Sequence, residues 1–261
     1  MKLFYVLLFT FLSLQFTNAR RKRRTFIDMT YVYDETTLRY PIFSKFKIEK
    51  LVKGPNKDLV TKWLQYEDFS TSTHTGTHMD APAHFVKGEI TVDEIPARSF
   101  FGKAAVIDIT RKASLSPDAV ATVEDVMNWE RTTQRCLNGT IVLLNSGWGH
   151  KWNDRDAFLG SSSDDTSTLH FPGFSPEACK WMTECRSIKG VGVDTASIDP
   201  GTTKISPCHG YVLRHRLFAL ENVANIDKLP ISGATLYVFP MKIGKGSGAP
   251  TRIVASVRMK N

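Results

Sequence analysis

The chain of 261 residues is 42% hydrophobic, enough to bury one substantial core, and we expect a single catalytic domain. Its 34 basic and 26 acidic residues give a net charge of +8; without Lys2 and the five basic residues at 20–24 the charge falls to +2. Because the body of the chain is nearly neutral and carries no motif that reads nucleic acid, we exclude a nucleic-acid-binding function.

The N-terminal 24 residues are predicted to lie outside that domain. Residues 3–16 form an almost unbroken apolar run that is too short to span a bilayer as a helix, and small residues follow at 17–19. This pattern predicts a signal peptide of residues 1–19 and a secreted protein with no membrane attachment after cleavage; a retained N-terminal helix is the alternative. The basic residues 20–24 are compatible with a processing site, a polyanion-binding segment or a solvated arm. The catalytic domain should then cover residues 25–261.

Short β-rich stretches alternate with helical segments along this domain. One helix is expected over residues 122–134, where Thr122 precedes acidic residues, and another begins at Ser175, with Pro176 at its first position. The alternation favours an α/β core over a β-sandwich. The predicted strands are residues 25–33, 104–109, 140–144, 190–193 and 235–239.

Four potential metal ligands or proton-transfer groups lie within eleven residues of each other in sequence: His74, His78, Asp80 and His84. A straight helix would turn Asp80 away from the histidines, and an extended strand would separate His74 from His78 by about 13 Å. Gly76 and Pro82 favour a bend, so we predict a loop wrapped around an ion. Imidazole and carboxylate ligands suit zinc or manganese better than calcium. A histidine-rich surface loop is the alternative.

The motif from His74 to His84, His-Thr-Gly-Thr-His-x-Asp-Ala-Pro-x-His, resembles the signature of the metal-dependent cyclase superfamily, which includes bacterial-type kynurenine formamidase and isatin hydrolase. The similarity continues through residues 26–30, 171–178, 190–199 and 240–255. It implies a swivelling β/β/α fold with a barrel-like mixed central sheet, and a homo-oligomer.

The resemblance also implies roles for individual residues. In that superfamily, the residues matching His74, His78 and Asp80 hold one divalent ion, Asp80 bridges to a second ion, and the residue matching His84 donates and accepts protons. The remaining ligands are a histidine and a glutamate twelve residues apart, and His209 and Glu221 have this separation.

These residues predict a secreted metal-dependent amidohydrolase. Metal-activated water would attack a carbonyl carbon, and His84 would carry its proton to the leaving nitrogen. The expected partner is a small-molecule amide, either an aryl formamide such as N-formylkynurenine or a cyclic amide such as isatin. The alternatives are a secreted binding or matrix-associated protein that keeps the ions without turnover, and a protein whose basic segment targets it to polyanions.

The residue that would stack on the substrate departs from the family pattern. Formamidase-like members commonly place a Trp before Pro-Gly near the first strand, whereas this chain has Tyr40 before Pro41 and Ile42. Tyr40 is therefore the candidate stacking residue, and N-formylkynurenine is less favoured as the substrate. Other aromatic residues, which could equally be packing residues, are Trp148, Trp152 and Phe171.

A secreted chain would expose its cysteines to an oxidising compartment, where three complete pairings are possible. Cys179 and Cys185 should share a helix on different faces, which disfavours a bridge between them. Cys136 and Cys185 each precede a predicted strand and could meet at a sheet edge. The fourth cysteine is Cys208.

Three further segments are expected at the surface. Asn138 begins an Asn-Gly-Thr glycosylation sequon. Residues 161–167 are rich in serine and aspartate and predict a solvated loop or a lid. Residues 244–248 lack the glycine spacing of a phosphate-binding loop and predict a tight turn beside the substrate.

Overall fold

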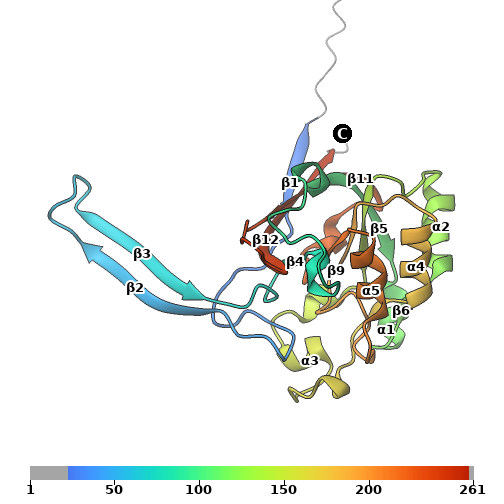
Figure 1. The fold of residues 1–261 in the computed structure, drawn as a ribbon, viewed down its shortest axis with the longest axis horizontal. Coiled ribbons are helices and arrows are strands. Elements are labelled where there is room, and N and C mark those ends of the chain that lie inside the picture. The colour runs from blue at the N-terminus through green and yellow to red at the C-terminus, as the bar shows by residue number, and fades with distance from the viewer. Residues whose placement is uncertain (1–22, 259–261) are drawn as a thin grey trace, which may run out of the picture.

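The computed structural model of the protein describes residues 23–258, so the predicted signal peptide lies outside the described residues. Its centre is a mixed sheet whose two ends meet, because the short strand β4 (His78–Asp80) pairs with both β10 and β12 (Figure 1). The closed sheet has seven strands and confirms the predicted barrel-like α/β architecture. The other six strands, in spatial order, are β12 (Gly248–Arg258), β11 (Ser232–Pro240), β5 (Phe101–Asp108), β7 (Thr140–Asn145), β9 (Gly190–Val193) and β10 (Phe218–Glu221).

Strands β7, β9 and β10 of the barrel are buried on both faces. In β7, Ile141 and Leu143 belong to the core cluster that also holds Met79, whereas Val142 and Leu144 belong to the cluster formed with the helices. Neighbours β5 and β9 run parallel to β7. A parallel strand covered on both sides reads as a continuous apolar run, which explains why β7 and β9 were predictable from the sequence.

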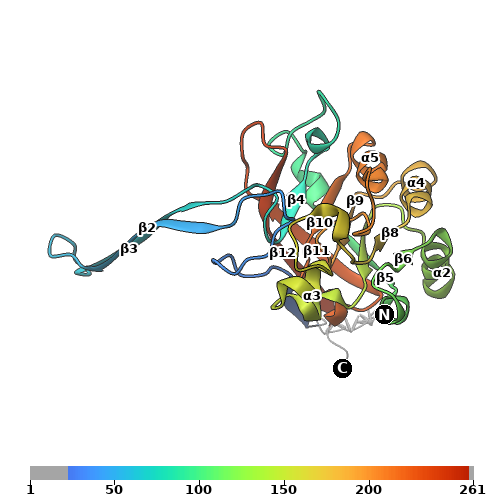
Figure 2. The ribbon, with the colours of Figure 1, turned by 90° about the horizontal axis from the view of Figure 1, so that it is seen from below.

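Three helices cover one side of the barrel: α2 (Val123–Thr133), α4 (Pro176–Glu184) and α5 (Pro207–Arg214) (Figures 1 and 2). The caps of the first two are as predicted. Thr122 and Asp125 form a reciprocal capping box on α2, and the Ser175 side chain accepts from the amide of Ala178 on α4. Helices α1 (Thr110–Leu115) and α3 (Arg155–Leu159) are short. No helix in residues 23–258 is long and apolar enough to cross a membrane.

Smaller elements complete the body. An outer strand β1 (Arg24–Asp28) pairs antiparallel with β12, and β6 (Val120–Ala121) pairs with β8 (Gly173–Phe174). Because β1 ends at Asp28, it is shorter than the strand predicted over residues 25–33. The 3-10 turns are η1 (Pro82–His84), η2 (Ala97–Phe100), η3 (Trp148–Lys151), η4 (Thr166–Thr168) and η5 (Ile226–Lys228).

A long hairpin, which the sequence analysis did not predict, projects from the body. It consists of β2 (Lys47–Pro55) and β3 (Trp63–Ser70), and both views show it standing clear of the barrel (Figures 1 and 2). Every residue of β3 is exposed, including Trp63, Tyr66 and Phe69. An isolated two-stranded hairpin is at best marginally stable in water. Because most of this arm packs against nothing else among the described residues, we expect it to require a packing partner.

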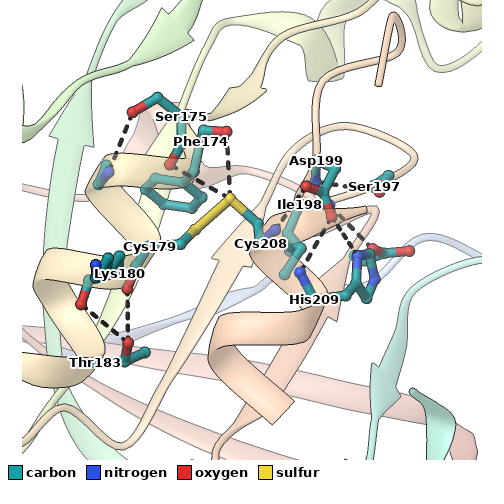
Figure 3. The surroundings of a disulfide bond; sticks show 12 residues. Phe174, Ser175, Cys179, Lys180, Thr183, Ser197, Ile198, Asp199, Cys208 and His209 are labelled. Carbon is teal, nitrogen blue, oxygen red and sulfur yellow. Dashed lines mark hydrogen bonds and ion pairs between the residues drawn. A yellow bond between two sulfur atoms is a disulfide. The ribbon is translucent and has the colours of Figure 1, made fainter. Parts of the chain in front are cut away.

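A disulfide joins Cys179 of α4 to Cys208 of α5, with their Cα atoms 5.4 Å apart (Figure 3). Cys136 and Cys185 are exposed and unbridged. The prediction that Cys136 and Cys185 could form a disulfide is therefore wrong. The reason is helix packing: α4 lies against α5, so Cys179 reaches a cysteine that is 29 residues away in sequence. Cys185 is the C-cap residue of α4, beyond the helix that was expected to include it.

Candidate metal centre and active site

The predicted motif contains a strand as well as bends. His78 and Asp80 lie two residues apart on β4, so their side chains point to the same face. His74 reaches that face from the preceding turn, where Gly76 has a φ of +64°. A Cβ atom at Gly76 would lie 2.8 Å from the Tyr33 ring, so backbone angle and space both require glycine. The prediction of a loop throughout was wrong, because β10 and β12 supply strand partners that the sequence did not reveal.

The two ligands predicted from the later part of the chain join this cluster. Glu221 ends β10 and lies directly opposite His78 in the antiparallel pairing with β4. His209 comes from the first turn of α5, where Pro207 occupies the first position. All five side chains are buried. They form two possible metal-binding triads, His74–His78–Asp80 and Asp80–His209–Glu221, whose ligand atoms lie within 4.8 Å of one another.

The spacing and environment of these atoms fit a divalent ion. His78 Nε2 lies 3.3 Å from Asp80 Oδ1, and His209 Nε2 lies 3.4 Å from Asp80 Oδ2. Ligands about 2.0–2.1 Å from a tetrahedral ion are separated by about 3.3 Å, so these distances match a shared ion better than ideal hydrogen bonds. His78 Nε2 and Asp80 Oδ2 are buried and lack a hydrogen-bond partner among the described residues. Such orphaned buried atoms are expected where an ion binds.

Neighbouring groups orient the histidines. His209 Nδ1 lies 2.6 Å from Asp199 Oδ2, and Asp199 also accepts the amide N–H groups of Cys208 and His209 (Figure 3). His78 Nδ1 donates to the carbonyl of Gly76, which leaves Nε2 facing the cluster. His74 Nε2 contacts Ser247 Oγ at 2.9 Å. Contacts of this kind fix the ring nitrogen that a metal ion uses.

The sequence analysis missed Asp199 and Ser247 as supporting residues. Asp199 ends the segment 190–199 that resembles the superfamily, and this position was a usable signal. Ser247 lies in the turn 244–248 that was expected beside the substrate. It lies instead beside His74, and Gly248 is close enough that a Cβ would sit 2.6 Å from that ring.

The charges of the cluster balance one another. Burial alone would lower the pKa of His78, but Asp80 and Glu221 outweigh burial and raise it to about 10. The pKa of His209 is also raised, because contacts with Asp199, Asp80 and Glu221 outweigh burial. Burial would raise the pKa of Asp80, yet the surrounding histidines hold it well below its usual range. Without an ion the imidazoles of His78 and His209 therefore retain protons that a cation would displace.

His84 lies beside the cluster and in neither triad. Its ring stacks on His74, with centroids 3.9 Å apart, and lies 6.1 Å from the ring of His209. Burial lowers the pKa of His84 to about 4, and the neighbouring histidines add to this effect. Its imidazole is therefore neutral at neutral pH and able to accept a proton.

A cavity of about 300 Å³ opens onto His84, His209 and Glu221. Tyr40, the predicted stacking residue, lines it together with Phe43 and Phe85, which the sequence analysis did not identify. Thr166, at the end of the serine-rich segment 161–167, lines it as well. The remaining lining residues are Ile42, Ala196, Ser197 and Ser206.

The other aromatic candidates pack elsewhere. Trp148 and Phe171 are buried in a separate cluster around α3, and Trp148 donates its indole N–H to the carbonyl of Phe158. Trp152 stacks on Tyr31, with ring centroids 3.8 Å apart. These three residues therefore pack within the protein and do not line the aromatic cavity.

Comparison with known proteins agrees with the geometry. The model of a family described as "Putative cyclase" matches residues 27–200. The isatin hydrolase of Roseibium aggregatum is 31% identical over 192 residues, which cover 70% of this chain and 72% of that protein. The kynurenine formamidase of Bordetella avium is 27% identical over 192 residues, covering 73% and 80%. The solved structure of isatin hydrolase A from Ralstonia solanacearum has a TM-score of 0.80 and 31% identity, covering 90% of this chain and 92% of that one.

Proposed function

Since the chain belongs to the Putative cyclase family and its relatives identify it as a metal-dependent amide hydrolase, we propose that it cleaves the C–N bond of a small aryl amide. The candidates are an aryl formamide such as N-formylkynurenine and a cyclic amide such as isatin. One observation carries the proposal: Asp80 belongs to both metal-binding triads, and these lie at an aromatic-lined cavity beside a neutral histidine.

We assign two divalent ions, zinc or manganese, to the two triads. His74 and His78 would hold one ion, His209 and Glu221 the other, and Asp80 would contribute to both ligand sets. Such ions lower the pKa of bound water toward neutrality and polarise a substrate carbonyl. The purely nitrogen and oxygen ligand set supports this choice of metals.

His84 is the residue that moves protons. Its neutral imidazole accepts a proton from the attacking water and returns it to the nitrogen that leaves when the C–N bond breaks. Its position supports this role, because it lines the cavity and stacks on His74 without joining either triad.

The cavity walls position the substrate. Phe43 and Phe85 provide aromatic surfaces close to His74 and His209, with ring centroids 5.1 and 4.4 Å apart. An aryl group packed against these rings and against Tyr40 would place its amide carbonyl toward Glu221 and the triads. Phe43 and Tyr40 come from the segment that departs from the formamidase pattern, so they are the residues expected to set substrate choice.

The proposal is tested by measuring metal content and hydrolysis together. Purified protein is assayed against N-formylkynurenine, isatin and a panel of aryl amides, with His84→Ala and Asp80→Ala as variants. We expect about two ions per wild-type chain, retained ions with at least about 100-fold lower turnover in His84→Ala, and loss of both properties in Asp80→Ala. Equal metal loss in the two variants would contradict the assigned roles. A metal-loaded wild type that hydrolyses none of the panel would overturn the aryl-amide substrate.

We further propose that the protein is secreted. The apolar run at 3–16 supports this, and so does the Cys179–Cys208 disulfide, since such bonds persist in oxidising compartments. Asn138 is exposed, as a used glycosylation site must be. Expression of the full chain in a eukaryotic secretory host should deliver protein to the medium with a new N-terminus near residue 20, and Asn138→Gln should remove any glycan shift. Retention of the chain inside the cell would count against secretion.

The working form is proposed to be a homo-oligomer. The β2–β3 arm supports this, because it projects from the body and exposes the apolar side chains of Leu51, Trp63 and Tyr66. An apolar hollow of about 700 Å³ lies at the arm's base, and a second copy of the arm could fill it. The residues that line it include Tyr33, Phe46, Ile48, Phe69, Met241 and Pro250.

A further inference from the structure

Asn222 directly follows Glu221, the last residue of β10, and combines two unfavourable features. Its φ is +54°, in the left-handed region that side chains other than glycine rarely adopt, although asparagine tolerates it better than most. The residue is 1% exposed, and its Oδ1 atom has no hydrogen-bond partner among the described residues. Backbone strain and an unpaired buried acceptor persist only where surrounding contacts fix them, and such residues cluster at functional sites.

Two other polar groups of Asn222 reach the turn that leads into β4. Its Nδ2 donates to the carbonyl of Gly76 at 2.8 Å, and its backbone carbonyl accepts from Thr77 Oγ1 at 2.7 Å. The opposite orientation of the carboxamide would bring Oδ1 against the Gly76 carbonyl, and because both are acceptors, Nδ2 must be the group that faces it. The backbone N–H of Asn222 donates to the carbonyl of Thr195 at 2.9 Å. Asn222 therefore fastens this turn to the end of β10.

The carbonyl of Gly76 connects Asn222 to a metal ligand. The same oxygen accepts from Nδ1 of His78 at 2.9 Å, so Asn222 and His78 share one acceptor. The orientation of a ligand histidine follows from the hydrogen bond that its other ring nitrogen makes. A displacement of the Gly76 carbonyl would therefore turn the ring that presents Nε2 to the metal centre.

The contacts of Asn222 also join the two ligand sets. Glu221, its neighbour in sequence, belongs to one triad, and His78 belongs to the other. These two ligands are direct partners in the β4–β10 pairing, and Glu221 Oε2 lies 3.4 Å from His78 Nε2. Asn222 lies where this pairing ends, so its contacts hold the two ligands at a fixed separation.

We propose that Asn222 is a positioning residue of the metal centre, which acts through the carbonyl of Gly76 to fix the ring of His78 relative to Glu221. The inference rests on the two-ion centre proposed above and on no particular substrate. Asn222 lines no part of the aromatic cavity and belongs to neither triad. Its effect on hydrolysis must therefore pass through the metal ligands.

The test compares Asn222→Gly with Asn225→Gly. Glycine adopts the left-handed conformation freely, so Asn222→Gly removes the side-chain contact without adding backbone strain. Asn225 is the matched control, because its φ is +57° and its Nδ2 also donates to a backbone carbonyl, that of Asp28, at 2.7 Å and outside both triads. Competition with a chromophoric chelator measures zinc affinity. Visible absorption of the cobalt(II)-loaded protein reports the geometry of the bound ions.

For Asn222→Gly we expect zinc affinity to fall about 10- to 100-fold and the cobalt(II) absorption bands to shift. Both properties should match the wild type in Asn225→Gly. Loss of a side-chain contact can lower stability in either variant, so the metal measurements are what separate positioning from a structural role. With saturating zinc and any aryl amide that the wild type hydrolyses, kcat should fall in Asn222→Gly while KM changes less than about twofold, because the cavity walls are untouched.

Wild-type zinc affinity with an unchanged cobalt(II) spectrum in Asn222→Gly would overturn the inference, and so would equal changes in the two glycine variants. Asn222→Asp provides a second test should the glycine variant fail to fold. It keeps the shape and the tolerance of left-handed backbone but presents an acceptor to the Gly76 carbonyl. A wild-type cobalt(II) spectrum in Asn222→Asp would also overturn the inference.

The metal measurements separate this inference from the proposed function. A wild-type chain that binds neither zinc nor cobalt(II) would overturn the metal centre and the role of Asn222 together. If the zinc and cobalt(II) results are as expected but no aryl amide is hydrolysed, the proposed substrate is overturned and the role of Asn222 is supported.

Discussion

Asp199 is the residue whose role is most sharply testable, because it touches the centre only through His209. Replacing Asp199 with Asn removes the charge that orients the ring, so we expect metal affinity to fall about 10- to 100-fold. Asp118→Asn is the matched control, since Asp118 contacts His170 in the same way at an exposed position. Competition with a chromophoric chelator measures both. Unchanged affinity in Asp199→Asn would show that His209 is oriented by packing alone.

His84 makes a pH-dependent contribution to stability. Its pKa is lowered to about 4 in the folded protein, against about 6.5 for an unperturbed histidine. The unfolded chain therefore takes up a proton at higher pH than the folded chain, and the free energy of unfolding falls as pH drops from 6.5 toward 4. Denaturant titrations of metal-free protein should show a smaller fall in His84→Gln. An identical fall in both proteins would contradict the lowered pKa.

Metal binding should also release protons at neutral pH. His78 has a pKa raised to about 10 in the absence of an ion, so its imidazole is protonated until a cation displaces the proton. Calorimetric titration with zinc in buffers of different ionisation enthalpy should reveal this release. Binding enthalpies that do not depend on the buffer would contradict it.

The metal ligands could be predicted from the sequence, whereas the residues that orient the ligand histidines could not. His74, His78, Asp80 and His84 formed a dense cluster, and His209 and Glu221 followed from family resemblance. Asp199 and Ser247 lie far from that motif in sequence and reach it only because β10 and β12 pair with β4 and α5 packs against β10. Phe43 was not predicted for a different reason: it is a single aromatic residue in a loop, and such a residue carries no periodic signal.

At the scale of elements, the disulfide between α4 and α5 fixes the helix that carries the ligand His209. Cys208 directly precedes His209 on α5, so releasing the bridge should loosen that ligand as well as the fold. For Cys179→Ser with Cys208→Ser we expect a loss of about 2–4 kcal/mol in the free energy of unfolding, together with weaker metal binding.

The control for this prediction is Cys136→Ser with Cys185→Ser, which removes two unbridged cysteines. Chemical denaturation and chelator competition measure stability and metal affinity in each variant. If both double variants lost the same stability, the effect would come from side-chain substitution and the bridge would contribute nothing.

Elements with a strong local pattern were predicted, and elements that depend on distant partners were not. Strands β7 and β9 are apolar runs, and α2 and α4 begin with recognisable caps. Strand β4 has only three residues and exists because β10 and β12 pair with it. The arm strands β2 and β3 mix charged residues with apolar ones, so their sequences do not show the apolar runs that predict buried strands.

At the scale of the whole molecule, the arm predicts an assembly. Leu51→Glu with Trp63→Glu places charges on the exposed arm, and we expect sedimentation to show a shift from dimer or larger to monomer. Leu115→Glu with Ile205→Glu changes exposed apolar residues of the body and should leave the assembly intact. A monomeric wild type at tens of micromolar would refute the homo-oligomer.

The barrel is closed by its shortest strand, and that strand carries two of the metal ligands. Opening the seam at β4 would separate His78 from Glu221, its partner across the β4–β10 pairing. The ion assigned to Asp80, His209 and Glu221 would therefore hold β4 against β10, because Asp80 lies on β4 and Glu221 on β10. Stripping the ion should then speed amide hydrogen exchange first in β4 and the adjacent ends of β10 and β12, before the parallel strands β5, β7 and β9 respond. Catalysis and mechanical closure of the scaffold would in this way depend on the same few bonds.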